Sequence, residues 1–190
     1  MKTKSTILLL CMAVAALAAT ADRFAATNGS VVKIEGTSSL HNWTMQGTTI
    51  QGEISAPLPD NWNAPAKAVV TIPVTTIKSE HAKMDKLMAE ALKAKAHPEI
   101  RYEMTAATPK SATAAAFVLE TKGRLTIAGV TRDLAMDVQG SRNADGRYTL
   151  AGTAPIKMTN FGVKPPTAML NTIKTGEDVK VTFRWVVQKQ

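Results

Sequence analysis

Strict alternation of apolar and polar residues near the C-terminus predicts a β-strand with one buried face. Every odd-numbered residue from Val179 to Val187 is apolar, whereas Lys180, Thr182 and Arg184 between them are polar or charged. Side chains of a strand point to its two faces in turn, so the apolar set faces the protein interior and the polar set faces solvent. The segment therefore belongs to a sheet that covers a hydrophobic core.

The same two-residue period recurs along the chain in short stretches separated by Gly, Pro, Asn and Asp, which is typical of an all-β protein. Turns are expected at 128–131 and 143–146. The expected strands cover residues 32–36, 48–55, 67–74, 100–105, 115–127, 134–138, 148–158 and 179–188. About eight antiparallel strands close a barrel that has room for one small ligand. We therefore expect an all-β fold with one helix, an eight-stranded antiparallel β-barrel.

The helix is expected at residues 80–95, where the apolar residues follow a helical period. Ser79 offers an N-cap, and His97-Pro98 ends the run. The apolar stripe consists of Met84, Leu87, Met88, Ala91 and Leu92. An amphipathic helix of this kind packs across the sheet or covers a barrel mouth.

Residues 159–176 are expected to form a long irregular connection that contains several apolar residues, including Phe161, Met169 and Leu170. Long loops in compact domains often act as lids or binding segments. A plain connection whose apolar residues cover the barrel end explains the pattern equally well. The sequence leaves both roles open.

The first 21 residues have the features of a cleavable export signal. Lys2 and Lys4 precede an apolar run from Ile7 to Ala19, and Ala19-Thr20-Ala21 supplies the small residues of a cleavage site. The run is shorter than the ~20 residues of a membrane-spanning helix. We expect cleavage after Ala21, a single domain at residues 22–190, and a periplasmic or secreted location. The loss of Cys11 would leave no cysteine for a disulfide or for thiol chemistry.

The positive charge of the chain argues against nucleic-acid binding because it is spread out. The net charge is +8 and falls to +6 when Lys2 and Lys4 are removed, and no five-residue block of Lys or Arg occurs. A basic stripe for nucleic acid is therefore absent from the sequence. A mild attraction to anionic lipid headgroups remains compatible with this charge, so peripheral contact with a membrane surface stays open.

The sequence contains no recognisable catalytic, metal or cofactor motif. His41, His81 and His97 lack the spacing of metal ligands, and neither a Gly-x-Ser-x-Gly elbow nor a glycine-rich phosphate loop occurs. Carboxylates such as Glu53 and Asp133 alternate onto expected solvent faces. We therefore expect no metal, no cofactor and no enzymatic activity. A lipid isomerase or hydrolase with His41 as its base is a distant alternative.

Inward-facing positions of the expected barrel supply the candidate ligand contacts. Alternation fixes the face of a side chain but does not separate ligand contacts from core contacts. The apolar candidates are Ile34, Trp43, Ile50, Ile54, Val70, Ile72, Leu87, Met88, Ile100, Tyr102, Met104, Leu125, Ile127, Leu134, Met136, Phe161, Phe183 and Trp185. His41 and Asn42 are candidates to orient a ligand's headgroup. The alternative is that these two side chains satisfy backbone groups in a turn.

The segment 123–138, G-R-L-T-I-A-G-V-T-R-D-L-A-M-D-V, resembles a hairpin of the YceI-like lipid- or polyisoprenoid-binding family. Segments 36–43, 97–102 and 160–163 resemble three further motifs of that family in the right order. The resemblance implies a lipocalin-like barrel, export to the periplasm and an isoprenoid chain in an apolar tunnel. Segment 84–88, M-D-K-L-M, departs from the Arg-Asp and double Phe of many members, which leaves the ligand's identity and length open.

The expected function is therefore that of a periplasmic lipid-binding protein. It would hold an isoprenoid or other long apolar ligand in the barrel, in a carrier or sequestering role. The alternative is an envelope interaction module, with a barrel filled by side chains and an exposed apolar patch near residues 161–170. The sequence sets neither the process that the protein serves nor its oligomeric state.

Overall fold

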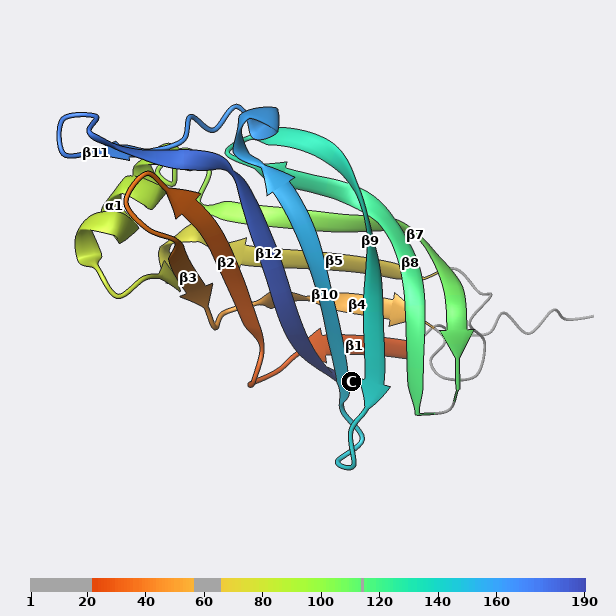
Figure 1. Cartoon of the computed structure of the whole chain (residues 1–190). Coiled ribbons are helices and arrows are strands. Elements are labelled where there is room, and N and C mark those ends of the chain that lie inside the picture. Colours follow the sequence, from red (N-terminus) through yellow and green to blue (C-terminus); the bar gives the residue numbers. More distant parts are fainter. Residues whose placement is uncertain (1–21, 57–65, 114) are drawn as a thin grey trace, which may run out of the picture.

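The computed structural model describes residues 22–56, 66–113 and 115–190, which form a closed antiparallel β-barrel with one α-helix (Figure 1). This confirms the fold class expected from the sequence. The strands are β1 (Asp22–Ala26), β2 (Val31–Ser38), β3 (Trp43–Gly47), β4 (Gln51–Ala56), β5 (Lys67–Pro73), β6 (Ile77–Lys78), β7 (Glu99–Ala112), β8 (Ala116–Ile127), β9 (Val130–Arg142), β10 (Tyr148–Lys157), β11 (Thr167–Ala168) and β12 (Ile173–Lys189). The helix is α1 (Ala82–Ala91), and η1 (Val74–Thr76) and η2 (Met158–Phe161) are short 3₁₀ helices.

Eight strands close the barrel. The hydrogen-bonded order is β1-β4-β5-β7-β8-β9-β10-β12, and β12 pairs back with β1. The order β12-β2-β3-β6 continues the wall. In the sequence, β2 follows β1, β3 precedes β4 and β6 follows β5. One strand, β12, therefore pairs with β2 along its middle and with β1 near its C-terminal end.

Large side chains fill the β1 end of the barrel. Phe24 and Tyr148 pack edge to face, with ring centroids 5.4 Å apart. Phe117, Leu150 and Val187 belong to the same buried cluster. Residues of β8, β10 and η2, among them Leu125, Ala154 and Phe161, form a second cluster, against which Ala91 and Leu92 pack at the end of α1. The two ends of the barrel thus differ in how fully side chains occupy them.

The helix is shorter than expected, and Ser79 is not its N-cap. The N-cap residue is His81, which makes no side-chain capping bond. The helical pattern fails after Ala91 because the chain forms turns at residues 92–96, with Lys93 in the left-handed region at φ 54°. Among the described residues, no helix has the length and apolar character needed to cross a bilayer.

Several strand boundaries also differ from the expectation. The strand expected at 48–55 is β4, at 51–56, and the expectation missed β1 and β3. Residues 159–176 are not one irregular loop, since they include part of η2, strand β11 and the start of β12. The first half of β12 was missed because Gly176, Glu177 and Asp178 break its alternation. The expected signal segment 1–21 lies outside the described residues.

Candidate ligand-binding site

The barrel encloses an apolar cavity of about 440 Å³, which lies within the size range of small-molecule sites. Its wall is formed mainly by inward-facing residues of the strands, and side chains of α1, the β2–β3 turn and β11 line it as well. We call this end, with Ser38, His41, His81, Lys83 and Thr167, the mouth. Figure 1 shows α1, the β2–β3 turn and β11 together at one end of the barrel.

Most of the apolar candidates predicted from the sequence line this cavity. They are Ile34, Trp43, Ile50, Val70, Ile72, Leu87, Met88, Ile100, Tyr102, Leu125, Ile127, Leu134, Met136, Phe161, Phe183 and Trp185. Ile54 and Met104 line a second, smaller cavity of about 100 Å³ instead. The structure thus gives the positions of these side chains, and their contact with a ligand stays a prediction.

The two cavities share part of their walls. The shared residues are Val70, Tyr102, Met136, Phe183 and Trp185. These residues mark the boundary between the large cavity on the mouth side and the small one among the residues of the filled end. A long ligand in the large cavity would therefore end near this boundary.

Two glycines make room for aromatic side chains of the wall. A Cβ at Gly36 would lie 2.2 Å from the Trp43 ring, and a Cβ at Gly123 would lie 2.5 Å from Tyr102 Cζ. Each ring lies directly over a residue that has no side chain. These close approaches give the two glycines a specific role in positioning the rings.

The sequence analysis missed other residues of the wall, although the signal for some of them was available. Val179 and Val181 lie on the apolar face of the strand already identified, and Ala154 and Ile156 alternate in the same way. The further apolar wall residues are Val32, Leu40, Met45, Ile77, Met84, Ala91, Leu92, Met158, Val163, Pro166, Ala168 and Ile173. Several of them lie in turns or short elements, where alternation gives no information.

A family model described as the YceI-like domain matches residues 23–187. The chain belongs to the YceI-like family. This confirms the resemblance seen in the sequence motifs. A comparison with curated protein sequences finds no significant match.

Solved structures of low sequence identity share the YceI-like fold. BcnA of Burkholderia cenocepacia is similar at TM-score 0.69 and 18% identity, over 84% of this chain and 96% of BcnA. A polyisoprenoid-binding domain from Saccharophagus degradans is similar at TM-score 0.67 and 11% identity, over 90% of this chain and 99% of that domain. A YceI protein of Campylobacter jejuni reaches TM-score 0.56 at 19% identity, over 77% and 84% of the two chains.

The helix of this YceI-like chain supplies pliable side chains to the cavity wall. Met84, Leu87, Met88 and Ala91 all line the cavity, and no residue of α1 is fully buried. Methionine adapts its shape readily because its side chain is unbranched and flexible. The helix therefore contributes side chains that can adapt their shape to the wall at the mouth.

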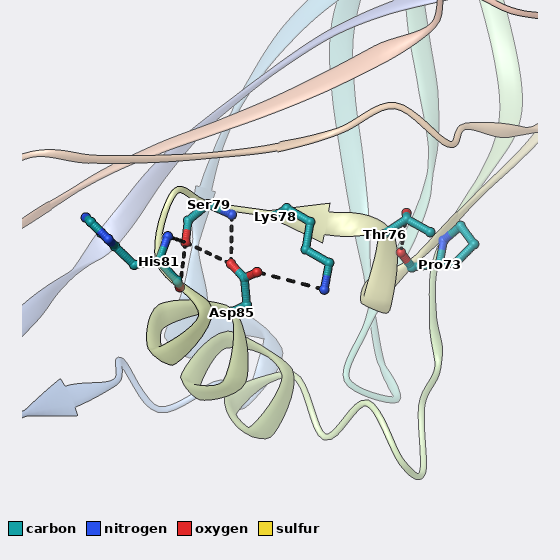
Figure 2. A network of polar contacts seen from close by, with 6 residues as sticks. All are labelled: Pro73, Thr76, Lys78, Ser79, His81 and Asp85. Carbon is teal, nitrogen blue, oxygen red and sulfur yellow. Dashed lines mark hydrogen bonds and ion pairs between the residues drawn. The ribbon is translucent and has the colours of Figure 1, made fainter.

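A polar network holds the first turn of α1 against β6 (Figure 2). The Ser79 N–H donates to Asp85 Oδ1 at 2.7 Å, the Ser79 hydroxyl lies 2.8 Å from the same oxygen, and Lys78 Nζ lies 3.8 Å from Oδ2. Ser79 Oγ also accepts from the His81 N–H at 3.1 Å. The pKa of Asp85 is lowered chiefly by the Ser79 backbone hydrogen bond, and burial opposes this shift.

The two headgroup candidates occupy different places. His41 lines the mouth, and its Nδ1 lies 2.7 Å from the Asn42 carbonyl, to which it donates when protonated there. Asn42 is exposed and lies outside the cavity wall. The backbone of this turn is satisfied by Ser38, whose Oγ accepts from the N–H groups of Leu40 and His41. His41 thus lies at the mouth and contacts a backbone carbonyl of the turn, whereas Asn42 lies outside the wall; contact of either side chain with a ligand stays a prediction.

Across residues 22–56, 66–113 and 115–190, no group of three His, Cys, Asp or Glu side chains is placed to hold a metal ion. The mouth residues His41, His81 and Lys83 are exposed, and most of the other residues that line the cavity are apolar. The arrangement can therefore enclose an apolar molecule and present a few polar groups at its entrance.

Replacing Asp85 by Asn tests the network that holds α1. We expect a loss of about 1–2 kcal/mol in the free energy of unfolding at pH 7, because hydrogen bonds to a carboxylate are lost. Since the folded-state pKa is below the ordinary 3.8, this stabilisation is present above pH 3.8 and disappears as the pH falls through the folded-state value. Urea unfolding of both proteins between pH 7 and pH 3 measures the difference.

The matched control is Asp133→Asn, at an exposed position of β9. It should change the unfolding free energy little at either pH. A difference between wild type and Asp85→Asn that stays constant as the pH falls would contradict the assignment to the ionised carboxylate.

Proposed function

We propose that this YceI-like protein binds an isoprenoid or other long apolar ligand inside its barrel and acts as a carrier or sequestering protein. The observation that supports this most is the apolar cavity of about 440 Å³ in the barrel interior. Of the His, Lys, Arg, Asp and Glu side chains, only His41, His81 and Lys83 line the described part of its wall, and all three lie at the mouth. The interior thus suits a hydrocarbon chain.

Burial of the hydrocarbon chain supplies the main favourable contribution to affinity. Each methylene taken from water contributes ~0.8 kcal/mol, so ten to fifteen buried carbons give about 8–12 kcal/mol before the costs of ordering are subtracted. Micromolar binding requires about 8 kcal/mol. The proposal therefore needs no charged anchor in the interior.

The fold comparison supports the same ligand class. The Saccharophagus degradans domain, which shares the fold, is described as polyisoprenoid-binding. We extend that class to this chain because its own cavity is lined mainly by apolar residues and shares part of its wall with a second apolar cavity.

We propose binding without catalysis. In the described residues, no Asp or Glu side chain lines either cavity, and His41 is hydrogen-bonded to a backbone carbonyl at the mouth. A general acid or base would have to lie within hydrogen-bonding reach of a substrate atom. The histidines of the described cavity walls, His41 and His81, both lie at the mouth. His41 is therefore better placed to contact a headgroup than to act on a chain inside the barrel.

The alternative function, an interaction module with a filled barrel, has less support. It requires side chains to occupy the interior, and a cavity of about 440 Å³ conflicts with that requirement. It also requires an exposed apolar patch over residues 161–170, yet Phe161 and Val163 are buried. Met169 and Leu170 are the only large hydrophobic residues of that segment that are exposed.

We propose that the mouth contacts an anionic phospholipid surface when the ligand is exchanged. The exposed large hydrophobic residues of the described chain are Leu40 at 66%, Met169 at 65% and Leu170 at 101% relative exposure. They lie at the same end, because the Ser39 N–H donates to the Lys174 carbonyl beside β11 at 2.9 Å. The lysine Lys174 in this region and Lys83 on α1 provide the complementary positive charge.

We also propose export to the periplasm, on the strength of the signal pattern in residues 1–21. The expected product starts at Asp22. Intact-mass measurement of the protein from a periplasmic fraction should give the mass of residues 22–190. Recovery of the uncleaved chain in the cytoplasm would contradict the proposal.

Filling the cavity should weaken ligand binding. Ala154 is buried in β10 and lines the cavity, so Ala154→Phe removes space for at least two methylenes and should lower the affinity for geranylgeraniol about tenfold or more. Titration calorimetry measures the affinity, and native mass spectrometry identifies any co-purified lipid.

The matched control is Ala135→Phe, at an exposed position of β9. It adds the same ring outside the barrel and should bind geranylgeraniol like the wild type. Failure of the wild type to bind this or any co-purified apolar ligand would overturn the proposed function.

Replacing Leu170 by Asp should reduce membrane association. Burial of a leucine side chain is worth about 1.5–3 kcal/mol, so partition onto vesicles of phosphatidylethanolamine and phosphatidylglycerol should fall at least tenfold. Sedimentation with the vesicles measures the bound fraction, and added salt should weaken the electrostatic part.

The control is Ala144→Asp, which adds the same charge in the β9–β10 turn. Figure 1 shows this turn at the end of the barrel away from β11. Equal loss of vesicle binding in the two variants would mean that general charge, and not the mouth, controls the association.

A further inference from the structure

Two polar atoms inside the barrel have no hydrogen-bond partner among the described residues. They are the indole nitrogen Nε1 of Trp185 and the hydroxyl oxygen of Tyr102. A buried polar group without a partner costs about 1–3 kcal/mol, so native proteins retain few of them. Two such atoms in one small region call for a physical explanation.

Trp185 presents a donor that can only be satisfied by an acceptor. Its side chain is buried in β12, with 3% of the residue exposed, and indole N–H accepts nothing. The other tryptophan of the wall behaves differently, since Trp43 Nε1 donates to the Thr37 carbonyl at 2.9 Å. Of these two described tryptophans, Trp185 alone has an unsatisfied N–H.

Tyr102 adds a second hydrogen-bonding group. Burial raises the pKa of its hydroxyl, and Thr121 lies beside it. The Thr121 hydroxyl itself donates to the Met136 carbonyl at 2.9 Å. Tyr102 thus stays neutral at physiological pH and keeps its capacity to donate.

Both side chains lie where the two cavities meet. Trp185 and Tyr102 line the large cavity and also the small one. This boundary is the deep end of the large cavity, away from the mouth residues. A ligand that fills the large cavity would therefore place one of its ends beside these two side chains.

A charged ligand group does not fit at this boundary. No Lys, Arg or His of the described chain lines the small cavity, and those of the large cavity lie at the mouth. An ion buried without an opposite charge is costly, whereas a neutral oxygen needs only a hydrogen bond. The chemistry of the boundary thus selects a carbonyl or hydroxyl oxygen over a carboxylate or phosphate.

We propose that the bound ligand carries a neutral oxygen, of a carbonyl or hydroxyl group, which accepts a hydrogen bond from Trp185 Nε1 at the inner end of the cavity, with Tyr102 as the second partner. The hydrocarbon chain runs from this oxygen toward the mouth. This inference rests on the proposed function, because it assumes that the cavity holds a long apolar ligand. It adds a polar anchor that a purely hydrocarbon ligand would leave unused.

The test compares a long-chain methyl ketone with the alkane of the same chain length in competition with one fluorescent lipid. Trp185→Phe should weaken ketone binding about three- to tenfold, the value of one hydrogen bond, and leave alkane binding unchanged. Trp43→Phe is the matched control, because its N–H is already bonded to Thr37. It should affect the ketone and the alkane equally.

A second measurement uses the wild-type chain. In a ¹⁵N-labelled sample, the indole N–H signal that disappears in Trp185→Phe should move downfield when the ketone binds, and it should not move downfield with the alkane. Tyr102→Phe provides another variant, with the same selective loss for the ketone, should Trp185→Phe fold poorly.

The outcomes separate the two proposals. If the ketone and the alkane bind and respond equally to both variants, the polar anchor is wrong and the proposed function stands. Tighter binding of the fatty carboxylate of equal length than of the ketone would also overturn the anchor. If the wild type binds neither the ketone nor the alkane, the proposed function itself fails.

Discussion

The pairing of β12 with both β1 and β2 is the constraint on which the rest of the structure depends. Through these two pairings, and the one with β10, the sheet closes on itself and leaves no long free edge. Closure with eight strands also sets the width of the interior, which is just large enough either for side chains or for one small ligand. What occupies the interior is then decided by the size of the inward-facing residues at each level of the barrel.

Those residues divide the barrel into a filled end and a hollow end. Phe24, Phe117 and Tyr148 occupy the β1 end, where large rings leave only a cavity of about 100 Å³. Toward the mouth, the wall has Ala154 and the methionines of α1, and a cavity of about 440 Å³ remains. The proposed ligand would enter at the mouth, beside the helix that the Ser79–Asp85 network holds in place.

Sequence alternation predicted the parts of this arrangement that depend on facing direction. It identified the barrel, the inward faces of β8, β9 and β12, and about half of the apolar residues of the cavity wall. It could not predict depth along the barrel, so Ile54 and Met104 were grouped with the residues of the large cavity although they line the small one. Nor could it find β1, whose five residues contain one large apolar side chain. It also predicted Ser79 as the N-cap, whereas the N-cap is His81, because the hydrogen bonds from Ser79 to Asp85 decide that geometry.

The proposed hydrocarbon ligand and the exposed residues of the mouth are linked by the energetics of release. If ten methylenes had to pass from the barrel into water, the transfer would cost about 8 kcal/mol, which corresponds to a factor of about 10⁶. Passage directly into a bilayer avoids most of this cost, because the chain stays in an apolar environment throughout. A mouth with Leu40 and Leu170 exposed beside lysines meets this need, since it can contact lipid tails and anionic headgroups together. The exposed hydrophobic residues, which are unfavourable for a protein in water, are thus explained by the same apolar interior that makes the ligand difficult to release.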